Sequence, residues 1–264
     1  MKLALTMMDQ AWKNKDENIN RVAELAGKAR DVEADFIILP EMTLTGFSME
    51  TQEIAEIAEI SESMLRFSEI AKNNDIGLIA GLVLESKGKY YNCSVAFDSS
   101  GENIGYYEKA HPFSFAGESR HISPGRGYSV FEVEGVRFGM SVCYDLRFPV
   151  YMQTLADNCD CIINIANWPA PRSGHWRILL QARSIENQVY VVGVNRVGGD
   201  GNQLEYAESS YAFSPDGMAM EPGESFESMF VVELDKELVL EAQRTFPVRD
   251  DRRPALYENF FNLN

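Results

Sequence analysis

Histidine and cysteine are scarce in this chain, which has three histidines and four cysteines among its 264 residues. Zinc sites need clusters of these ligands at set spacings, and Cys159-Asp-Cys161 does not have the spacing of a zinc knuckle. Four cysteines in a chain of this size do not make a disulfide framework either. We therefore expect no metal site. A redox protein built on Cys159 and Cys161 is a weak alternative, because the chain has no Cys-x-x-Cys motif.

Long apolar runs and positive charge are also lacking. No run approaches the roughly 20 residues that cross a bilayer, and residues 1–9 are too short for a signal peptide before the charged segment near Lys13. We therefore expect a cytoplasmic protein. The net charge of −16 disfavours nucleic acid and anionic membranes as partners. An anionic substrate is not excluded, because a local pair of arginines in a desolvated pocket can outweigh a distant field.

No stretch of the sequence divides the chain into parts. It contains no Pro- or Ser-rich linker, no charge run, no short-period repeat and no low-complexity tract. A chain of this length can bury roughly 75% of its unfolded surface around one core. We therefore expect a single domain over residues 1–264, with a C-terminal extension from about residue 246. This tail either packs on a partner subunit or frays, and the sequence favours neither outcome.

Short apolar segments rich in Val, Ile and Phe alternate with amphipathic segments. The first kind predicts strands, and the second kind predicts helices. Their order, with turn residues at Gly101 and Gly217, predicts an α/β sandwich of two mixed sheets face to face with helices outside. The expected strands are Leu3–Met7, Phe36–Leu39, Gly77–Leu84, Tyr91–Asp98, Ser129–Val133, Val136–Cys143, Cys161–Ala166, Tyr190–Val197, Tyr206–Phe213 and Ser228–Leu234. The expected helices are Glu17–Val32, Met64–Lys72, Val150–Leu155 and Trp176–Asn187.

Three residues of complementary chemistry, Glu41, Lys109 and Cys143, each follow a strand-like segment. A cysteine attacks an acyl carbon as a thiolate and needs a base within reach. None of the histidines ends a strand-like run as Glu41 does, and a carboxylate shielded by apolar residues suits proton transfer. The oxyanion that forms needs fixed donors, for which Lys109 and the backbone N–H of Tyr144 are candidates. This order of residues is typical of a cysteine amidohydrolase.

Each of the three residues has a simpler explanation when it is taken alone. Glu41 could cap the Thr43–Phe47 turn or pair with a surface lysine, and Lys109 could be one exposed lysine among many. A free cysteine such as Cys143 is more often a small buried hydrophobe than a nucleophile. The order and similar settings of the three residues favour the catalytic interpretation.

The sequence around these residues resembles the three signature blocks of the nitrilase superfamily. The blocks are Leu39-Pro-Glu41-Met-Thr-Leu-Thr-Gly46-Phe47, Tyr107-Glu-Lys109-Ala-His111 and Ser141-Val-Cys143-Tyr-Asp-Leu-Arg147-Phe-Pro149. Segments at Asn167–Trp176, Ala182–Gln188 and Val194–Gly198 are similar to the omega-amidase branch. The resemblance runs from about Leu3 to Tyr257, and three blocks in order are far more specific than one.

This resemblance implies a four-layer αββα sandwich of the nitrilase type, assembled as a homodimer and using neither a metal nor an organic cofactor. It implies that Glu41 is the general base and acid, Lys109 the oxyanion donor and Cys143 the nucleophile. Glu118 would orient Lys109 and hold its charge, unless it is a solvated loop residue. At Val150 many relatives carry glutamate, and we expect this departure to affect packing rather than chemistry.

By the same resemblance, the substrates are short omega-amides of dicarboxylic acids, such as 2-oxoglutaramate and 2-oxosuccinamate. Their distal carboxylate needs an arginine or a cluster of donors, and Arg147 and Arg172 are the candidates. Arg147 could instead form a structural ion pair with Asp145 or another carboxylate. The other expected substrate-binding residues are Phe113 and Trp168 as apolar walls, with Phe115 and Trp176 beside them, and His175 as a brace of its loop.

Two other functions stay open at this point. Another amidase of the superfamily would act on deaminated glutathione, an N-carbamoyl compound or an aliphatic amide, because the motifs do not report the length of the substrate. A catalytically silent relative that only binds metabolites or partners is a weaker alternative, since Glu41, Lys109 and Cys143 are all present.

Overall fold

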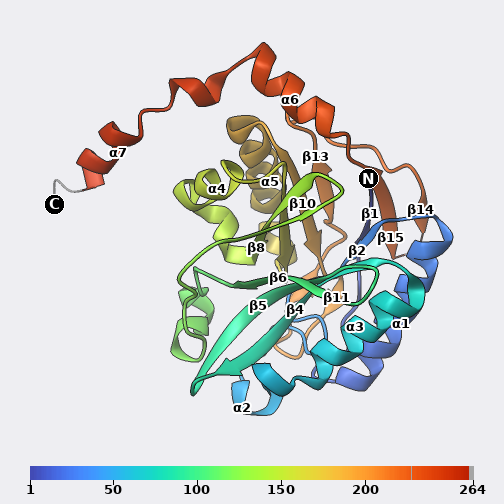
Figure 1. The fold of residues 1–264 in the computed structure, drawn as a ribbon. Helices are drawn as coiled ribbons and strands as arrows, with labels where there is room; N and C mark the ends of the chain where they lie inside the picture. The colour runs from blue at the N-terminus through green and yellow to red at the C-terminus, as the bar shows by residue number, and fades with distance from the viewer. Residues whose placement is uncertain (227, 262–264) are drawn as a thin grey trace.

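The computed structural model describes residues 1–226 and 228–261 as two β-sheets packed face to face, with helices on their outer faces (Figure 1). The strands are β1 (Lys2–Thr6), β2 (Phe36–Ile38), β3 (Glu56–Ile57), β4 (Gly77–Ser86), β5 (Lys89–Phe97), β6 (Asn103–Glu108), β7 (Ser129–Val133), β8 (Val136–Val142), β9 (Cys161–Ala166), β10 (Tyr190–Asn195), β11 (Gly198–Gly199), β12 (Glu205–Tyr206), β13 (Tyr211–Phe213), β14 (Ser225–Phe226) and β15 (Met229–Glu233). The α-helices are α1 (Lys15–Asp31), α2 (Thr51–Ile54), α3 (Glu62–Asn74), α4 (Pro149–Ala156), α5 (Ser173–Asn187), α6 (Lys236–Thr245) and α7 (Pro254–Phe261).

Both large sheets are mixed. The first has the strand order β14-β15-β1-β2-β4-β5-β6, with β3 beside β4, and the second has the order β13-β10-β9-β8-β7. In the first sheet β1 is parallel to β2 and antiparallel to β15. In the second sheet β8 is parallel to β9 and antiparallel to β7. The predicted sandwich of two mixed sheets is therefore confirmed.

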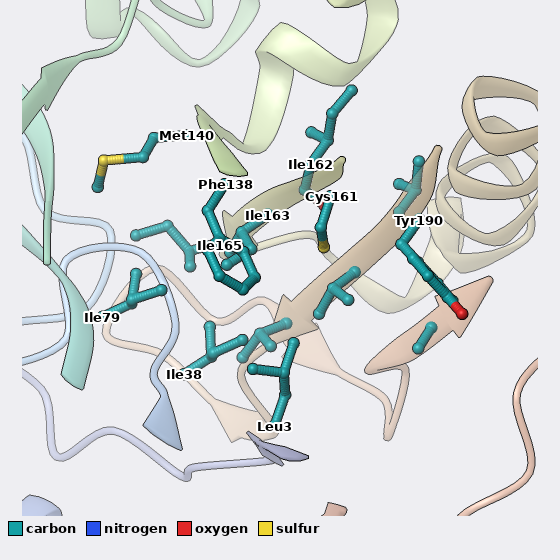
Figure 2. Packing of buried hydrophobic residues seen from close by; sticks show 14 of the residues in the cluster. Leu3, Ile38, Ile79, Phe138, Met140, Cys161, Ile162, Ile163, Ile165 and Tyr190 are labelled. Carbon is teal, nitrogen blue, oxygen red and sulfur yellow. The ribbon is translucent and has the colours of Figure 1, made fainter. Parts of the chain in front are cut away.

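A continuous apolar core fills the space between the two sheets. The facing residues labelled in Figure 2 include Leu3, Ile38 and Ile79 of the first sheet and Phe138, Ile163 and Ile165 of the second. Successive strand residues point to opposite faces, so the neighbours Ala4, Ile37 and Leu78 pack in a second cluster with apolar residues of α1 and α3. One set of strands thus supplies both the inner core and the helix-facing core.

Helices α1 and α3 cover the outer face of the first sheet, and α4 and α5 cover that of the second (Figure 1). Helix α1 begins after Asn14, whose side-chain oxygen accepts a hydrogen bond from the Glu17 N–H at 3.2 Å. Helix α4 begins at Pro149, whose fixed φ suits the first helical position. In residues 1–226 and 228–261, no helix is both long and apolar enough to cross a membrane.

The predicted helices and most predicted strands are present, with one correction. The single strand expected at Tyr206–Phe213 is two strands, β12 and β13. Between them, Ser210 Oγ accepts a hydrogen bond from the Asn195 N–H at 3.0 Å, so side-chain bonds replace a continuous ladder. The strands β3, β6, β11 and β14 and the helices α2, α6 and α7 are not among the expected elements.

The segments that follow β2, β6, β8 and β9 leave the two sheets near one another. Cys143 directly follows β8 and Asn167 directly follows β9. Because these strands are parallel neighbours, their carboxyl ends lie side by side. Glu41 lies three residues after β2 of the facing sheet, and Lys109 directly follows β6. The face-to-face packing of the sheets therefore brings all four residues to one place.

Candidate active site

Cys143 lies at a sharp junction between a strand and a 3₁₀ turn. It follows β8 and is the first residue of the turn Cys143–Arg147. Its φ of +47° is in the left-handed region, which a residue with a Cβ adopts only when its surroundings impose it. Only 7% of the residue is exposed, yet it lines the apolar cavity described below. The thiol is thus held rigidly at the end of a core strand and stays accessible.

Glu41 is fully buried, and its carboxylate accepts three hydrogen bonds. Oε1 accepts from Lys109 Nζ at 2.9 Å and from Asn92 Nδ2 at 2.7 Å, while Oε2 accepts from the Asn167 N–H at 2.8 Å. The turn that carries Glu41 lies directly on Gly81 of β4, where a Cβ would come within 2.8 Å of the Glu41 Cα. This burial contradicts a surface ion pair as the explanation for Glu41.

Lys109 and Glu118 are also fully buried. Lys109 Nζ donates to Glu118 Oε2 at 2.8 Å and to Oε1 at 3.1 Å, in addition to its bond with Glu41. Glu118 Oε2 also accepts from the Phe113 N–H at 2.5 Å. Lys109 is therefore not an exposed lysine, and Glu118 is not a solvated loop charge. We call Glu41, Lys109 and Glu118 the charged cluster.

Burial and the two carboxylates determine the proton state of Lys109 and Cys143. Burial alone would lower the pKa of Lys109, but Glu118 and then Glu41 outweigh it and raise that pKa well above its usual value. Burial raises the pKa of the Cys143 thiol well above its usual value, and the charge of Glu41 raises it further. Lys109 is thus an ammonium, and the resting cysteine is a neutral thiol.

Tyr144 follows Cys143 in the 3₁₀ turn. The first N–H groups of a helical turn have no acceptor within it, so the Tyr144 N–H can donate to a ligand atom beside the Cys143 sulfur. The Tyr144 ring packs on Phe113 and Phe148, with centroid distances of 4.7 and 5.2 Å. These contacts fix the orientation of the turn.

A cavity of about 380 Å³ opens over Cys143. Cys143, Tyr144 and Asn167 form part of its lining, and the charged cluster lies beneath them without exposed surface. The aromatic residues that line it include Trp12, Phe47, Phe113, Phe115, Trp168 and Tyr206. Phe113, Phe115 and Trp168 therefore occupy the wall positions expected from the sequence.

Arg147 and Arg172 both line this cavity. The Arg147 guanidinium lies over the Trp168 ring at 4.7 Å from its centroid, and that of Arg172 lies over the Phe113 ring at 5.6 Å. Within the described part of the chain, no ion pair involves either guanidinium. Two cations without acidic partners beside an apolar cavity favour a ligand that carries a carboxylate.

Comparison with known proteins agrees with this geometry. The profile of the carbon-nitrogen hydrolase family matches residues 2–244. This chain belongs to that family. The predicted membership of the nitrilase superfamily is confirmed, and the protein is a hydrolase that acts on amide carbon–nitrogen bonds.

Relatives of known sequence and structure cover nearly the whole hydrolase. The Omega-amidase YafV of Escherichia coli (strain K12) is 34% identical over 255 residues, which are 95% of this chain and 96% of that protein. The 2-oxoglutaramate amidase of Bacillus subtilis (strain 168) is 32% identical over 259 residues, which are 97% and 98% of the two chains. The crystal structure of XC1258 from Xanthomonas campestris, a CN-hydrolase superfamily protein with an arsenic adduct in its active site, has a TM-score of 0.88 at 28% identity and covers 96% of this chain and 97% of that chain.

Two expected lining residues of the hydrolase lie elsewhere. His175 is exposed and does not line the cavity, although its Nδ1 lies 3.5 Å from Arg147 Nη2. Trp176 is fully buried, and its Nε1 donates to the Ser209 carbonyl at 2.6 Å. It occupies the inward face of α5 beside Trp168, so it belongs to the core rather than to the cavity wall.

Asp145 does not form the ion pair with Arg147 that the sequence leaves open. Its carboxylate is fully buried and accepts from Tyr107 Oη at 2.8 Å, from the His111 N–H at 3.0 Å and from the Val142 N–H at 3.0 Å. It also lies 2.8 Å from His111 Nδ1. Asp145 therefore ties the loop after Lys109 to the strand end before Cys143.

Sequence reasoning missed two asparagines that hold the charged cluster. Asn92 lies in β5 and donates to Glu41, and Asn167 donates to the Glu41 carbonyl through Nδ2 at 2.5 Å as well as to Oε2 through its N–H. The only signal for Asn92 is a polar residue inside the strand-like segment Tyr91–Asp98. Such a residue is as often solvent-facing as buried, and nothing local names its partners.

The charged cluster has the composition of a proton-transfer site rather than of a metal site. It joins two carboxylates to one lysine, and a lysine ammonium has no lone pair for a metal. Across residues 1–226 and 228–261, no group of three or more His, Cys, Asp or Glu side chains is arranged to hold a metal ion.

Proposed function

We propose that this hydrolase cleaves the terminal carboxamide of short omega-amides of dicarboxylic acids, such as 2-oxoglutaramate and 2-oxosuccinamate, to the acid and ammonia. The observation that carries the proposal is a thiol, Cys143, between the buried charged cluster and a cavity that holds Arg147 and Arg172. The names of the relatives from Escherichia coli and Bacillus subtilis point to the same substrate class.

The acylation step follows from the proton state of the site. The thiol proton of Cys143 passes to Glu41 as the sulfur bonds to the amide carbon, and the carbonyl oxygen becomes an oxyanion. Lys109 and the Tyr144 N–H stabilise this negative charge. The oxyanion then re-forms the carbonyl, the carbon–nitrogen bond breaks, and the nitrogen takes the proton from Glu41 to leave as ammonia. A thioester on Cys143 remains.

Hydrolysis of the thioester reverses the proton transfers. A water molecule gives a proton to Glu41 while its oxygen attacks the thioester carbon. The second oxyanion is stabilised by the same donors, and its collapse breaks the carbon–sulfur bond. The Cys143 sulfur takes the proton back from Glu41, and the dicarboxylic acid leaves. Glu118 does not transfer a proton in this scheme; it fixes Lys109 through two hydrogen bonds.

In this proposal, Arg147 and Arg172 of the cavity orient the substrate. With the carboxamide at Cys143, the distal carboxylate of a four- or five-carbon monoamide extends toward the wall of the cavity. Arg147 is on the same 3₁₀ turn as Cys143, and Arg172 lies over the Phe113 ring in the cavity lining. A charge-assisted bond to either guanidinium would distinguish such amides from neutral aliphatic amides.

We also propose that the hydrolase is a cytoplasmic homodimer. The location rests on the sequence alone. The dimer rests on the family resemblance and on an apolar strip of α5, where Ile178 and Ile185 are exposed by 65% and 52%. These residues are seven positions apart and share one helix face. Paired helices of two sandwiches would bury this strip.

A panel of amides tests the proposed reaction. Ammonia release is measured with 2-oxoglutaramate, succinamate, N-carbamoyl-β-alanine, acetamide and 4-methylpentanamide, which replaces the carboxylate of succinamate by a neutral group of the same shape. We expect kcat/KM for succinamate to exceed that for 4-methylpentanamide by about 100-fold, the value of a charge-assisted bond. Faster turnover of the neutral amide would overturn the proposed substrate class and leave the amidase chemistry intact.

The chemistry itself is tested by mass spectrometry during turnover. We expect the wild-type protein to carry an acyl group on Cys143, which Cys143→Ala lacks together with all ammonia release. Cys161→Ala is the matched control, because Cys161 is equally buried in the same sheet but lies outside the cavity. Ammonia release that survives in Cys143→Ala would show that the nucleophile is assigned wrongly.

A further inference from the structure

Asn92 contacts every member of the charged cluster. It lies in β5 and is fully buried. Its Nδ2 donates to Glu41 Oε1 at 2.7 Å and to Glu118 Oε1 at 2.9 Å. Its backbone carbonyl accepts from the Lys109 N–H at 2.8 Å. One neutral residue thus holds both carboxylates and the strand end that presents the lysine.

The chemistry of the cluster determines which end of the Asn92 amide faces the carboxylates. An amide turned the other way would place its oxygen against two carboxylate oxygens, and three acceptors cannot bond to one another. The Asn92 Oδ1 is buried and has no partner in the described part of the chain. Leaving this oxygen unpaired is unfavourable, so the two charge-assisted bonds of Nδ2 are the contacts that fix the orientation.

The hydrogen bonds at Glu41 distinguish its two oxygens. A carboxylate oxygen has two lone pairs. Both lone pairs of Oε1 are engaged, one by Lys109 Nζ at 2.9 Å and one by Asn92 Nδ2 at 2.7 Å. Oε2 accepts one bond, from the Asn167 N–H at 2.8 Å, and keeps one lone pair for a proton.

We infer that Asn92 is a positioning residue that, together with Lys109, reserves Oε2 of Glu41 for the proton exchanged with Cys143 and the leaving ammonia. The inference rests on the proposed function, in which Glu41 carries that proton. Asn92 lies outside the cavity lining and touches no substrate. Its contribution is to keep Oε1 unprotonated and Glu41 turned so that Oε2 faces the reaction.

Two substitutions at one position test this role. Asn92→Ala removes both donors, and we expect kcat to fall by about 10- to 100-fold while KM changes little, because the cavity is untouched. Asn92→Asp places a third carboxylate beside Glu41 and Glu118, and only its protonated form can donate a hydrogen bond. Close carboxylates raise one another's affinity for protons, so we expect the kcat–pH profile of Asn92→Asp to shift toward lower pH, with partial recovery of kcat in acid.

Asn164 provides a matched control. It is a fully buried strand asparagine in β9, its Nδ2 donates to Ser141 Oγ at 2.9 Å, and its Oδ1 likewise has no partner in the described residues. We expect Asn164→Asp and Asn164→Ala to lower thermal stability as the Asn92 variants do, without any shift of the kcat–pH profile.

Three results would overturn the inference. They are a kcat of Asn92→Ala within about twofold of wild type, a defect confined to KM, or an equal loss in Asn92→Asp and Asn92→Ala at every pH. The first two need only the alanine variant, so the inference stays testable if Asn92→Asp does not fold. None of these results affects the proposed function, which fails instead if Cys143→Ala still releases ammonia.

Discussion

Lys109 is bonded to two carboxylates, Glu41 and Glu118, which have different roles in the proposed reaction. Glu41 exchanges protons with the substrate, while Glu118 bonds Lys109 Nζ through both of its oxygens. Taking a lysine fully out of water is unfavourable unless opposite charges and hydrogen bonds compensate. Glu118 is the largest of the influences that raise the pKa of Lys109 against burial. Its main role is therefore to keep Lys109, the proposed oxyanion donor, charged.

Removing the charge of Glu118 should move the pH dependence of the enzyme. With both carboxylates present, the pKa of Lys109 is well above its usual value, so its proton is lost only in strong alkali. In Glu118→Gln, the largest influence that opposes burial is lost, Glu41 and Cys143 remain, and the pKa of Lys109 falls. We expect the alkaline limb of the kcat/KM profile to move to lower pH, with a loss of about tenfold or more at pH 9. Steady-state kinetics from pH 6 to 10 measure this shift.

Glu108→Gln is the control for that experiment. Glu108 is next to Lys109 in the sequence, but its side chain lies beside Tyr106 Oη at 3.4 Å and not in the charged cluster. The alkaline limb of the kcat/KM profile of Glu108→Gln should match that of the wild type. A limb that stays in place in Glu118→Gln would show that Glu118 does not maintain the charge of Lys109.

The sequence allows the charged members of the site to be predicted but not the two asparagines that hold them. Glu41, Lys109 and Cys143 are recognisable because each falls in a family block, and Glu118 is implied by the same resemblance; the structure brings the four together. Asn92 is as fully buried as Glu41, and its side chain donates to two members of the cluster. Its partners are up to 51 positions away along the chain. No local pattern encodes that pairing, because it depends on sheet register.

At the scale of elements, Asp145 joins the 3₁₀ turn of Cys143 to the loop that follows β6. The Asp145 carboxylate accepts hydrogen bonds from Tyr107 Oη and from the backbone N–H groups of His111 and Val142. An asparagine of the same shape would turn an NH₂ group toward some of these donors. Both elements that present reacting groups are therefore held by one carboxylate.

Asp145→Asn should weaken both stability and turnover. We expect a loss of about 1–3 kcal/mol in the free energy of unfolding, the usual effect of leaving buried donors unpaired, and a lower kcat because Cys143 and Lys109 are no longer held in register. Differential scanning calorimetry and ammonia assays measure the two effects.

Asp160→Asn is the control that separates the loss of stability from the loss of turnover in Asp145→Asn. Asp160 is also buried and accepts from the Arg137 N–H at 2.9 Å and from Arg137 Nη2 at 2.8 Å, at the opposite end of β8 from Cys143. It should lower the melting temperature to a similar degree and keep kcat within about twofold. If both variants lose turnover equally, the defect of Asp145→Asn is general instability and not a loss of alignment.

Helices and strands can be predicted from the sequence where buried residues recur at a regular spacing. Ile19, Val22 and Leu25 of α1 recur at helical spacing and are all buried, as the pattern requires. The segment from Tyr206 to Phe213 has the composition of a strand, yet its serines bond to β10 through side chains and interrupt it. Local composition predicts the strand, and only the tertiary contact determines where it breaks.

At the scale of the whole molecule, the surface is strongly acidic, while the cavity contains two arginines that form no ion pair with any described residue. The net charge of −16 repels anionic polymers, but this long-range repulsion does not prevent a small anionic substrate from binding at close range. The family profile ends at residue 244, close to the end of α6, so the following segment with α7 is not part of the matched region. Arg249 and Arg252 of that segment both pair with Asp157, at 2.8 and 2.5 Å, which attaches it to the end of α4.

The proposed homodimer is the prediction that belongs to this scale. Light scattering should give the wild-type protein about twice the chain mass of 29.7 kDa. The double variant Ile178→Glu/Ile185→Glu places two charges on the exposed face of α5, and burying unpaired charges in an interface is strongly unfavourable, so we expect it to elute as a monomer. Ile60→Glu is the control, because Ile60 is 76% exposed but precedes α3 in the other helical layer. A monomeric wild type would refute the dimer, and dissociation by Ile60→Glu alone would place the interface on the layer that contains α1 and α3.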